Sequence, residues 1–156
     1  MPANDEIVEI LNAVLTGELT SINQYFLDAK MLDNWGYERL GAHFREESID
    51  EMKDADELIE RILYLDGLPN VQRMSSVRIG ETAVEKFELA LALEVEAIER
   101  LNAGIARCVE SGDNGTRDLL AKILHGEEEH ADWLTTQLEL VSQVGESAYL
   151  AQQIHD

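Results

Sequence analysis

The feature that most constrains the fold is a repeated pattern of apolar stripes, interrupted by acidic residues at matching places in both halves of the chain. Apolar residues recur at steps of three and four, the spacing of one helix face, and no segment alternates as a half-buried strand does. The stripe around Glu18 matches the one around Glu94, and the stripe around Glu51 matches the one around Glu127, each 76 residues later. One helical hairpin cannot bury its own apolar face, so we expect two hairpins to close into a four-helix bundle.

Capping and breaking residues set the expected helix boundaries. Asn4 suits an N-cap, the segment 82–85 has the Thr-x-x-Glu form of a capping box, and Gly67 and Gly112 mark helix ends. A chain of 156 residues is expected to form one domain, 1–156. The sequence therefore predicts an all-α fold with helices over about 5–34, 38–66, 82–111 and 113–144, and a short helix over about 146–154.

The segment 67–80 lacks helical periodicity and is predicted to be one long crossover. Its 14 residues span roughly 45 Å when extended, and a helix of about 28 residues is roughly 42 Å long. The segment is thus long enough to return along the bundle, so the helices before and after it should run parallel.

Six ionisable residues lie at stripe positions that face the centre of the expected bundle. Ionised carboxylates are costly there unless they are paired or bind metal, and no lysine or arginine occupies these stripes. Two pairs with a spacing of three put both members on one helix face, and a single glutamate faces them from each other helix. A lone pair of this kind is usually solvated surface, but the complete set is nearly the pattern of di-iron carboxylate bundles. The predicted ligands are Glu18, Glu51, Asp54, Glu94, Glu127 and His130.

Composition restricts the partners and the compartment. Asp and Glu number 32 against 12 Lys and Arg, a formal charge of -20, which repels nucleic acid and anionic membranes and attracts cations. Cys108 is the single cysteine and forms no internal disulfide, and the N-terminus has no secretory signal. No apolar run approaches the roughly 20 residues that span a bilayer. We therefore expect a cytoplasmic protein with no nucleic-acid or membrane partner.

Over essentially its whole length the sequence resembles the bacterioferritins. The segments that carry the resemblance are Glu18-Leu-Thr-Ser-Ile-Asn-Gln-Tyr25-Phe, Asn34-Trp-Gly36, Glu47-Ser-Ile-Asp-Glu51-Met52, Arg61-Ile-Leu-Tyr-Leu-Asp-Gly-Leu-Pro-Asn70, Glu127-Glu-Glu-His130 and Thr136-Gln-Leu-Glu-Leu140. The resemblance implies a ferritin-like bundle in a cage of 24 subunits, which oxidises Fe(II) at an intrasubunit di-iron site and stores ferric mineral. It also implies haem b, held between two subunits of a two-fold dimer by Met52 of each, and a ferredoxin-type reductant for iron release.

The resemblance assigns a role to each predicted ligand. It implies that Glu51 and Glu127 bridge the two irons and that Glu18 and Glu94 are terminal ligands. It also implies that His130 completes the coordination of one iron. Tyr25 and Trp133 match positions near the family's site that can supply electrons, and for Tyr25 simple core packing is an equal interpretation. Glu46 and Asp50 match an inner-surface iron position of the family.

Asp54 departs from the family pattern, which has histidine at this position. Aspartate reaches less far than imidazole and adds a charge, so the ligands sum to -5 against +4 for two Fe(II). Our hypothesis is that one iron position is weaker and turnover altered. The alternative is a storage or structural shell subunit whose ferroxidase activity Asp54 impairs.

Two other di-iron families fit the sequence less well. A rubrerythrin-like peroxidase typically needs an additional cysteine-ligated iron, which Cys108 alone cannot build. The mini-ferritins that protect DNA place their irons between subunits and lack this complete intrasubunit set of ligands.

Overall fold

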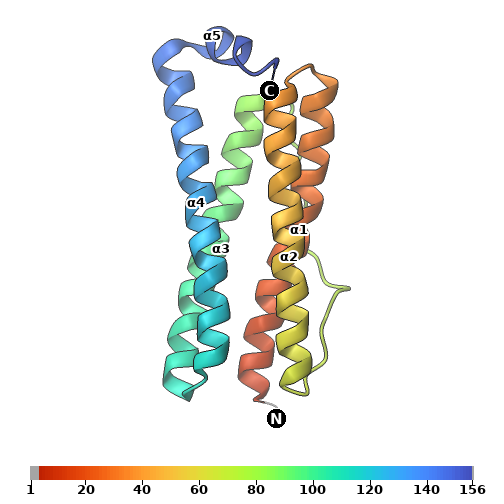
Figure 1. Ribbon diagram of the computed structural model, residues 1–156, viewed down its shortest axis with the longest axis vertical. Helices are drawn as coiled ribbons and strands as arrows, with labels where there is room; N and C mark the ends of the chain where they lie inside the picture. The colour runs from red at the N-terminus through yellow and green to blue at the C-terminus, as the bar shows by residue number, and fades with distance from the viewer. Residues whose placement is uncertain (1–3, 156) are drawn as a thin grey trace.

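Five helices make up the structure, a computed structural model that describes residues 4–155 (Figure 1). No strand occurs in this part of the chain. The helices are α1 (Asp5–Asn34), α2 (Glu38–Tyr64), α3 (Ala83–Ser111), α4 (Asn114–Val144) and α5 (Glu146–Ala151). The expected all-α four-helix bundle with a short fifth helix is confirmed.

Side-chain caps begin three of the long helices. The Asn4 side chain accepts a hydrogen bond from the Ile7 amide at 3.2 Å, and Thr82 accepts one from the Glu85 amide at 3.1 Å. Asp113 caps α4 in the same way, through the amide three residues later. Each cap satisfies an amide that the first helical turn leaves without an intrahelical partner, which is why the starts at Asn4 and Thr82 were readable from sequence.

Two helices end earlier than the sequence predicts. The helix expected over 38–66 ends at Tyr64, because Asp66 adopts a left-handed conformation with φ of 58° and the Gly67 amide turns back to the Ile62 carbonyl at 2.9 Å. The left-handed residue is thus the aspartate and not the glycine that follows it. The helix expected over 146–154 ends at Ala151, and turns replace its last residues.

The two helical hairpins lie side by side, α1 with α2 and α3 with α4 (Figure 1). The chain between α2 and α3 returns along the outside of the first hairpin, so that α2 and α3 run in the same direction. This is the single long crossover that the sequence predicted. No helix in the described part of the chain is both long and apolar enough to cross a membrane.

A row of polar side chains on α1 holds the crossover against the bundle. Four side chains spaced four residues apart accept hydrogen bonds at 2.8–3.0 Å from groups of residues 70, 73, 75 and 78. The accepting residues are Asn12, Thr16, Thr20 and Gln24. An extended segment without its own secondary structure needs partners for its backbone amides, and α1 supplies several of them.

The apolar core is divided into two clusters. The first contains Leu11, Leu15 and Leu58 and lies toward the beginning of α1, and the second contains Phe44 and Phe87 and lies toward its end. The acidic stripe residues occupy the level between the clusters, because they interrupt the apolar pattern at the same height on all four long helices. Packing on both sides fixes the helices that carry the polar side chains.

An ion pair is buried inside the second half of the bundle. Lys86 on α3 is 0 % exposed, and its Nζ donates to Asp28 Oδ1 on α1 at 2.9 Å. The same nitrogen lies 3.3 Å from Met31 Sδ and 5.2 Å from the centre of the Trp35 ring. The sequence patterns indicated no such pair, because neither residue belongs to the predicted stripes.

Candidate metal centre

Buried glutamates from all four long helices form a polar layer between the two apolar clusters. Glu18 comes from α1, Glu51 from α2, Glu94 from α3 and Glu127 from α4, and each is at most 4 % exposed. His130 lies one turn after Glu127 and is equally buried. The helical spacing read from the sequence therefore brings five of the six predicted ligands into one buried layer.

Asp54 joins three of these glutamates at one end of the layer. Glu18, Glu51, Asp54 and Glu127 each offer an oxygen, and the four oxygens lie within 4.8 Å of one another. Asp54 is only partly buried. The shorter side chain thus still reaches the group of candidate ligands, in the position where the resemblance leads one to expect histidine.

Glu94 and His130 form the other end of the layer. Glu94 Oε1 accepts a hydrogen bond of 2.5 Å from the Tyr25 hydroxyl, and the same oxygen lies 3.0 Å from His130 Nδ1. The Tyr25 and His130 rings meet edge to face with centres 5.3 Å apart. Tyr25 therefore both packs in the core and fixes one oxygen of a candidate ligand.

Burial, followed by repulsion between neighbouring carboxylates, raises the pKa of the acidic groups. The pKa values of Glu18, Glu51 and Glu127 are raised well above the ordinary value. Burial raises the pKa of Glu94 to about 7, although hydrogen bonding with Glu127 and then with Tyr25 opposes the change, and burial raises that of Asp54 to about 8. A group of carboxyls in this state must hold protons or bind cations.

The layer keeps polar atoms without partners. Glu18 Oε2, Glu94 Oε2 and His130 Nε2 are buried and make no hydrogen bond. In the part of the chain that the structure describes, no lysine or arginine pairs with the layer glutamates. Buried polar atoms of this kind are rare unless a ligand satisfies them. The oxygen-rich donor set with one imidazole fits iron, because carboxylates suit Fe(III) and imidazole suits Fe(II).

Two residues that the sequence analysis did not assign lie beside this layer. The His43 ring on α2 stacks on Trp133 of α4, with centres 3.4 Å apart and planes 11° apart. Glu47, one turn after His43, places Oε2 3.5 Å from His130 Nδ1. The sequence held a signal for them, since positions 43, 47 and 51 follow one another at steps of four on one helix face.

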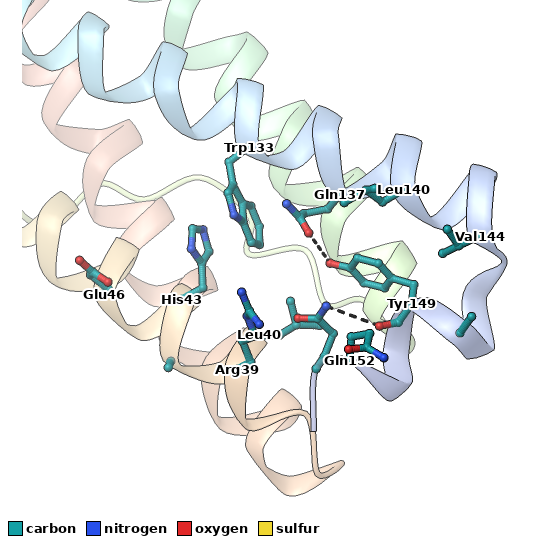
Figure 2. Close-up of a pocket in the computed structure, with 13 residues that line it drawn as sticks. Arg39, Leu40, His43, Glu46, Trp133, Gln137, Leu140, Val144, Tyr149 and Gln152 are labelled. Atoms are coloured by element: carbon teal, nitrogen blue, oxygen red, sulfur yellow. Dashed lines mark hydrogen bonds between the residues drawn. The ribbon is translucent and has the colours of Figure 1, made fainter. Parts of the chain in front are cut away.

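Two surface cavities flank the stacked rings, and His43 and Trp133 line both. The smaller, of about 430 Å³, is also lined by Glu51, Asp54 and Glu127. The larger, of about 710 Å³, lies between the start of α2, the end of α4 and α5 (Figure 2). On its far wall the Tyr149 hydroxyl donates to Gln137 Oε1 at 2.6 Å.

Met52 lies away from the layer. Its side chain is 58 % exposed on the outer face of α2, and Ile49, one turn earlier, is also exposed. An outward apolar pair on a helix is free to contact another subunit, as the resemblance requires of a shared haem ligand.

Comparison with known proteins agrees with this architecture. A family model described as "Ferritin-like domain" matches residues 8–144. The chain is 53 % identical over 152 residues to a protein named bacterioferritin from Mycobacterium bovis, covering 97 % of this chain and 96 % of the relative. A protein of the same name from Streptomyces coelicolor is 46 % identical over 151 residues, covering 97 % of this chain and 90 % of the relative.

Proposed function

The chain belongs to the bacterioferritins, a ferritin-like family of iron-storage proteins, and we propose that it oxidises Fe(II) with dioxygen at the buried carboxylate layer before storing the ferric product. The observation that carries this proposal is the layer itself: buried carboxylates from four helices, with no cationic side chain to neutralise them. Bound cations neutralise and stabilise such a layer, and its oxygens stabilise Fe(III) once the substrate has lost an electron.

The residues of the layer would hold the two irons in different ways. Following the resemblance, Glu51 and Glu127 hold both irons, Glu18 and Glu94 hold one each, and His130 completes one of them. The pKa values of Glu94 and Asp54, about 7 and about 8, mean that the metal-free site retains protons at neutral pH, which Fe(II) displaces as it binds. Each Fe(II) then gives one electron to dioxygen.

Asp54 would act as a ligand in the place of the family's histidine. Its oxygen belongs to the same close group as those of Glu18, Glu51 and Glu127. An additional carboxylate in place of imidazole favours Fe(III) over Fe(II), so the Fe(II) substrate is bound more weakly at this position and its oxidation is slowed. This supports the second candidate function, a storage shell in which oxidation at the centre is impaired.

Stopped-flow absorbance tests the proposal directly. Aerobic Fe(II) is mixed at two equivalents per subunit with the metal-free protein, with Asp54→His and Glu51→Gln, and with Glu60→Gln as the control for an exposed position on the same helix. A fast phase that saturates at this ratio and disappears in Glu51→Gln supports the ferroxidase function. Slow oxidation that Asp54→His accelerates supports the impaired shell, and equally slow oxidation in all four proteins refutes both.

Assembly into a homo-oligomeric cage follows from the family, and we propose the 24-subunit form built from two-fold dimers. Exposed apolar side chains on α2, including Ile49 and Met52, supply surface for such a dimer. Light scattering on the purified protein should give a particle of twenty-four chains. The cytoplasm is the proposed compartment, and a ferredoxin-type protein is the proposed reductant for iron release.

Haem b would bind at the dimer interface through Met52 of each subunit. The exposed thioether on the outer face of α2 supports this role, because a ligand shared across a two-fold axis must point away from its own core. Met52→Leu should abolish haem uptake, measured by the Soret band after reconstitution. Met74→Leu, at another exposed methionine, should leave uptake unchanged. Normal uptake by Met52→Leu would contradict the assignment.

A further inference from the structure

A second cluster of metal-ligating side chains lies beside the carboxylate layer and is not used by the proposed oxidation. His43, Glu47 and His130 each offer one ligand atom, and these atoms lie within 4.8 Å of one another. Glu47 Oε1 is 4.0 Å from His43 Nε2, and Glu47 Oε2 is 3.5 Å from His130 Nδ1. The His43 Nε2 atom is buried and makes no hydrogen bond.

The chemistry of this cluster differs from that of the layer. Two imidazoles and one carboxylate with free coordination positions are a donor set typical of Fe(II), whereas the group at Asp54 consists of oxygens alone. We propose that His43 and Glu47, together with His130, form an additional binding position for a divalent transition-metal cation. The inference rests on the proposed function only in taking Fe(II) as the physiological occupant.

His130 is shared between this position and the layer. Its Nδ1 lies 3.0 Å from Glu94 Oε1 and 3.5 Å from Glu47 Oε2. One ring nitrogen has one lone pair, so it serves a cation at the layer or a cation at the additional position, but not both at once. A cation that takes His130 Nδ1 together with His43 and Glu47 therefore excludes one that uses the same atom beside Glu94.

The additional position is also nearer to solvent than the layer. The side chains of His43 and Glu47 are 23 % and 20 % exposed, against 1 % for His130. Figure 2 shows His43 on α2 facing Trp133 on α4 at the edge of the larger cavity. Because the stacked rings line both cavities, the cluster lies where a hydrated ion first meets the side chains that lead to the layer. The position is thus a transfer site between the surface and the layer.

Cobalt is a suitable probe, because Co(II) binds nitrogen and oxygen ligands and is located by anomalous diffraction at its absorption edge. Crystals of the metal-free full-length protein are soaked in Co(II) chloride, and solution affinity is measured by equilibrium dialysis. The test variant is His43→Phe, which keeps an aromatic ring against Trp133 and so preserves the packing. His125→Phe, at an exposed histidine of α4 outside the cluster, is the matched control.

The expected result is an anomalous peak between His43, Glu47 and His130 that is absent in His43→Phe and retained in His125→Phe. Dialysis should show that His43→Phe weakens one class of Co(II) binding at least about tenfold, the lower end of what loss of a group supporting a metal site costs. A peak at Asp54 and the glutamates with none at His43 would overturn this inference and leave the proposed function standing. No peak at either place would overturn both.

Discussion

Replacing Asp54 with asparagine should stabilise the metal-free protein, and the gain should grow as the pH rises. Burial, and then repulsion from Glu18, raises the pKa of Asp54 from 3.8 to about 8 in the folded protein. A carboxyl with a raised pKa keeps its proton in the folded state after the unfolded chain has released it. The contribution of Asp54 to wild-type stability is therefore fully present below about pH 4 and is lost progressively as the pH rises to about 8. Asparagine has a similar shape and no charge, so the variant does not lose this stability as the pH rises.

The two pKa values set the size of the effect. Each pH unit between them is worth about 1.36 kcal/mol, so the full difference corresponds to about 6 kcal/mol. Asp54 is only partly buried, and solvent screening reduces this to roughly 3 kcal/mol. The part that develops between pH 5 and pH 8 is then about 2 kcal/mol, which shifts the melting temperature of a chain this long by roughly 4 to 8 °C.

Thermal unfolding followed by circular dichroism measures this difference. Both proteins are melted at pH 5 and pH 8, at equal concentration and with a chelator present. Asp50→Asn, at an exposed carboxylate one turn earlier on α2, is the matched control and should change the free energy of unfolding by less than about 0.5 kcal/mol at either pH. An equal gap between Asp54→Asn and wild type at both pH values would refute the reasoning, as would a less stable variant at pH 8.

Three further predictions concern a buried ion pair and the packing of two glycines. Lys86→Met should lower the free energy of unfolding by about 3 kcal/mol at pH 8, since it leaves the buried Asp28 carboxylate without its partner. The loss should be smaller at pH 5, because burial raises the pKa of Asp28 to about 6 and the carboxyl is then protonated. Adding Asp28→Asn to Lys86→Met should recover stability. A Lys86→Met protein with the wild-type free energy of unfolding at pH 8 would count against the ion pair. Gly126→Ala should stabilise α4 by about 1 kcal/mol, because an added Cβ meets nothing within 4 Å. Gly80→Ala should destabilise the protein by about 1 to 3 kcal/mol, since its Cβ would lie 2.8 Å from the Lys86 backbone nitrogen. Matched urea titrations should show that the two glycine variants change the free energy of unfolding in opposite directions.

Local periodicity was enough to predict the bundle and most of its candidate metal centre. A helix fixes the direction of each side chain relative to its neighbours three and four residues away, so the stripes placed Glu18, Glu94 and Glu127 on inward faces before any contact was known. The length of the segment 67–80 was similarly enough to predict parallel α2 and α3, because only a long extended link returns along a helix.

Contacts between helices were decided by the tertiary structure. Whether Asp54 reaches the oxygens of other helices depends on how far apart α1, α2 and α4 pack, and no repeat within one helix specifies that distance. The stack of His43 on Trp133 and the approach of Glu47 to His130 depend on the rotation and offset of α2 against α4.

The buried ion pair between α1 and α3 has the same origin. Lys86 and Asp28 are 58 residues apart, and each reads in the sequence as an ordinary charged residue off the core stripe. The sequence by itself therefore determined which faces turn inward, because that is a property of a single helix. Only the tertiary structure decided which inward side chains touch, because that depends on the distance, rotation and offset between helices.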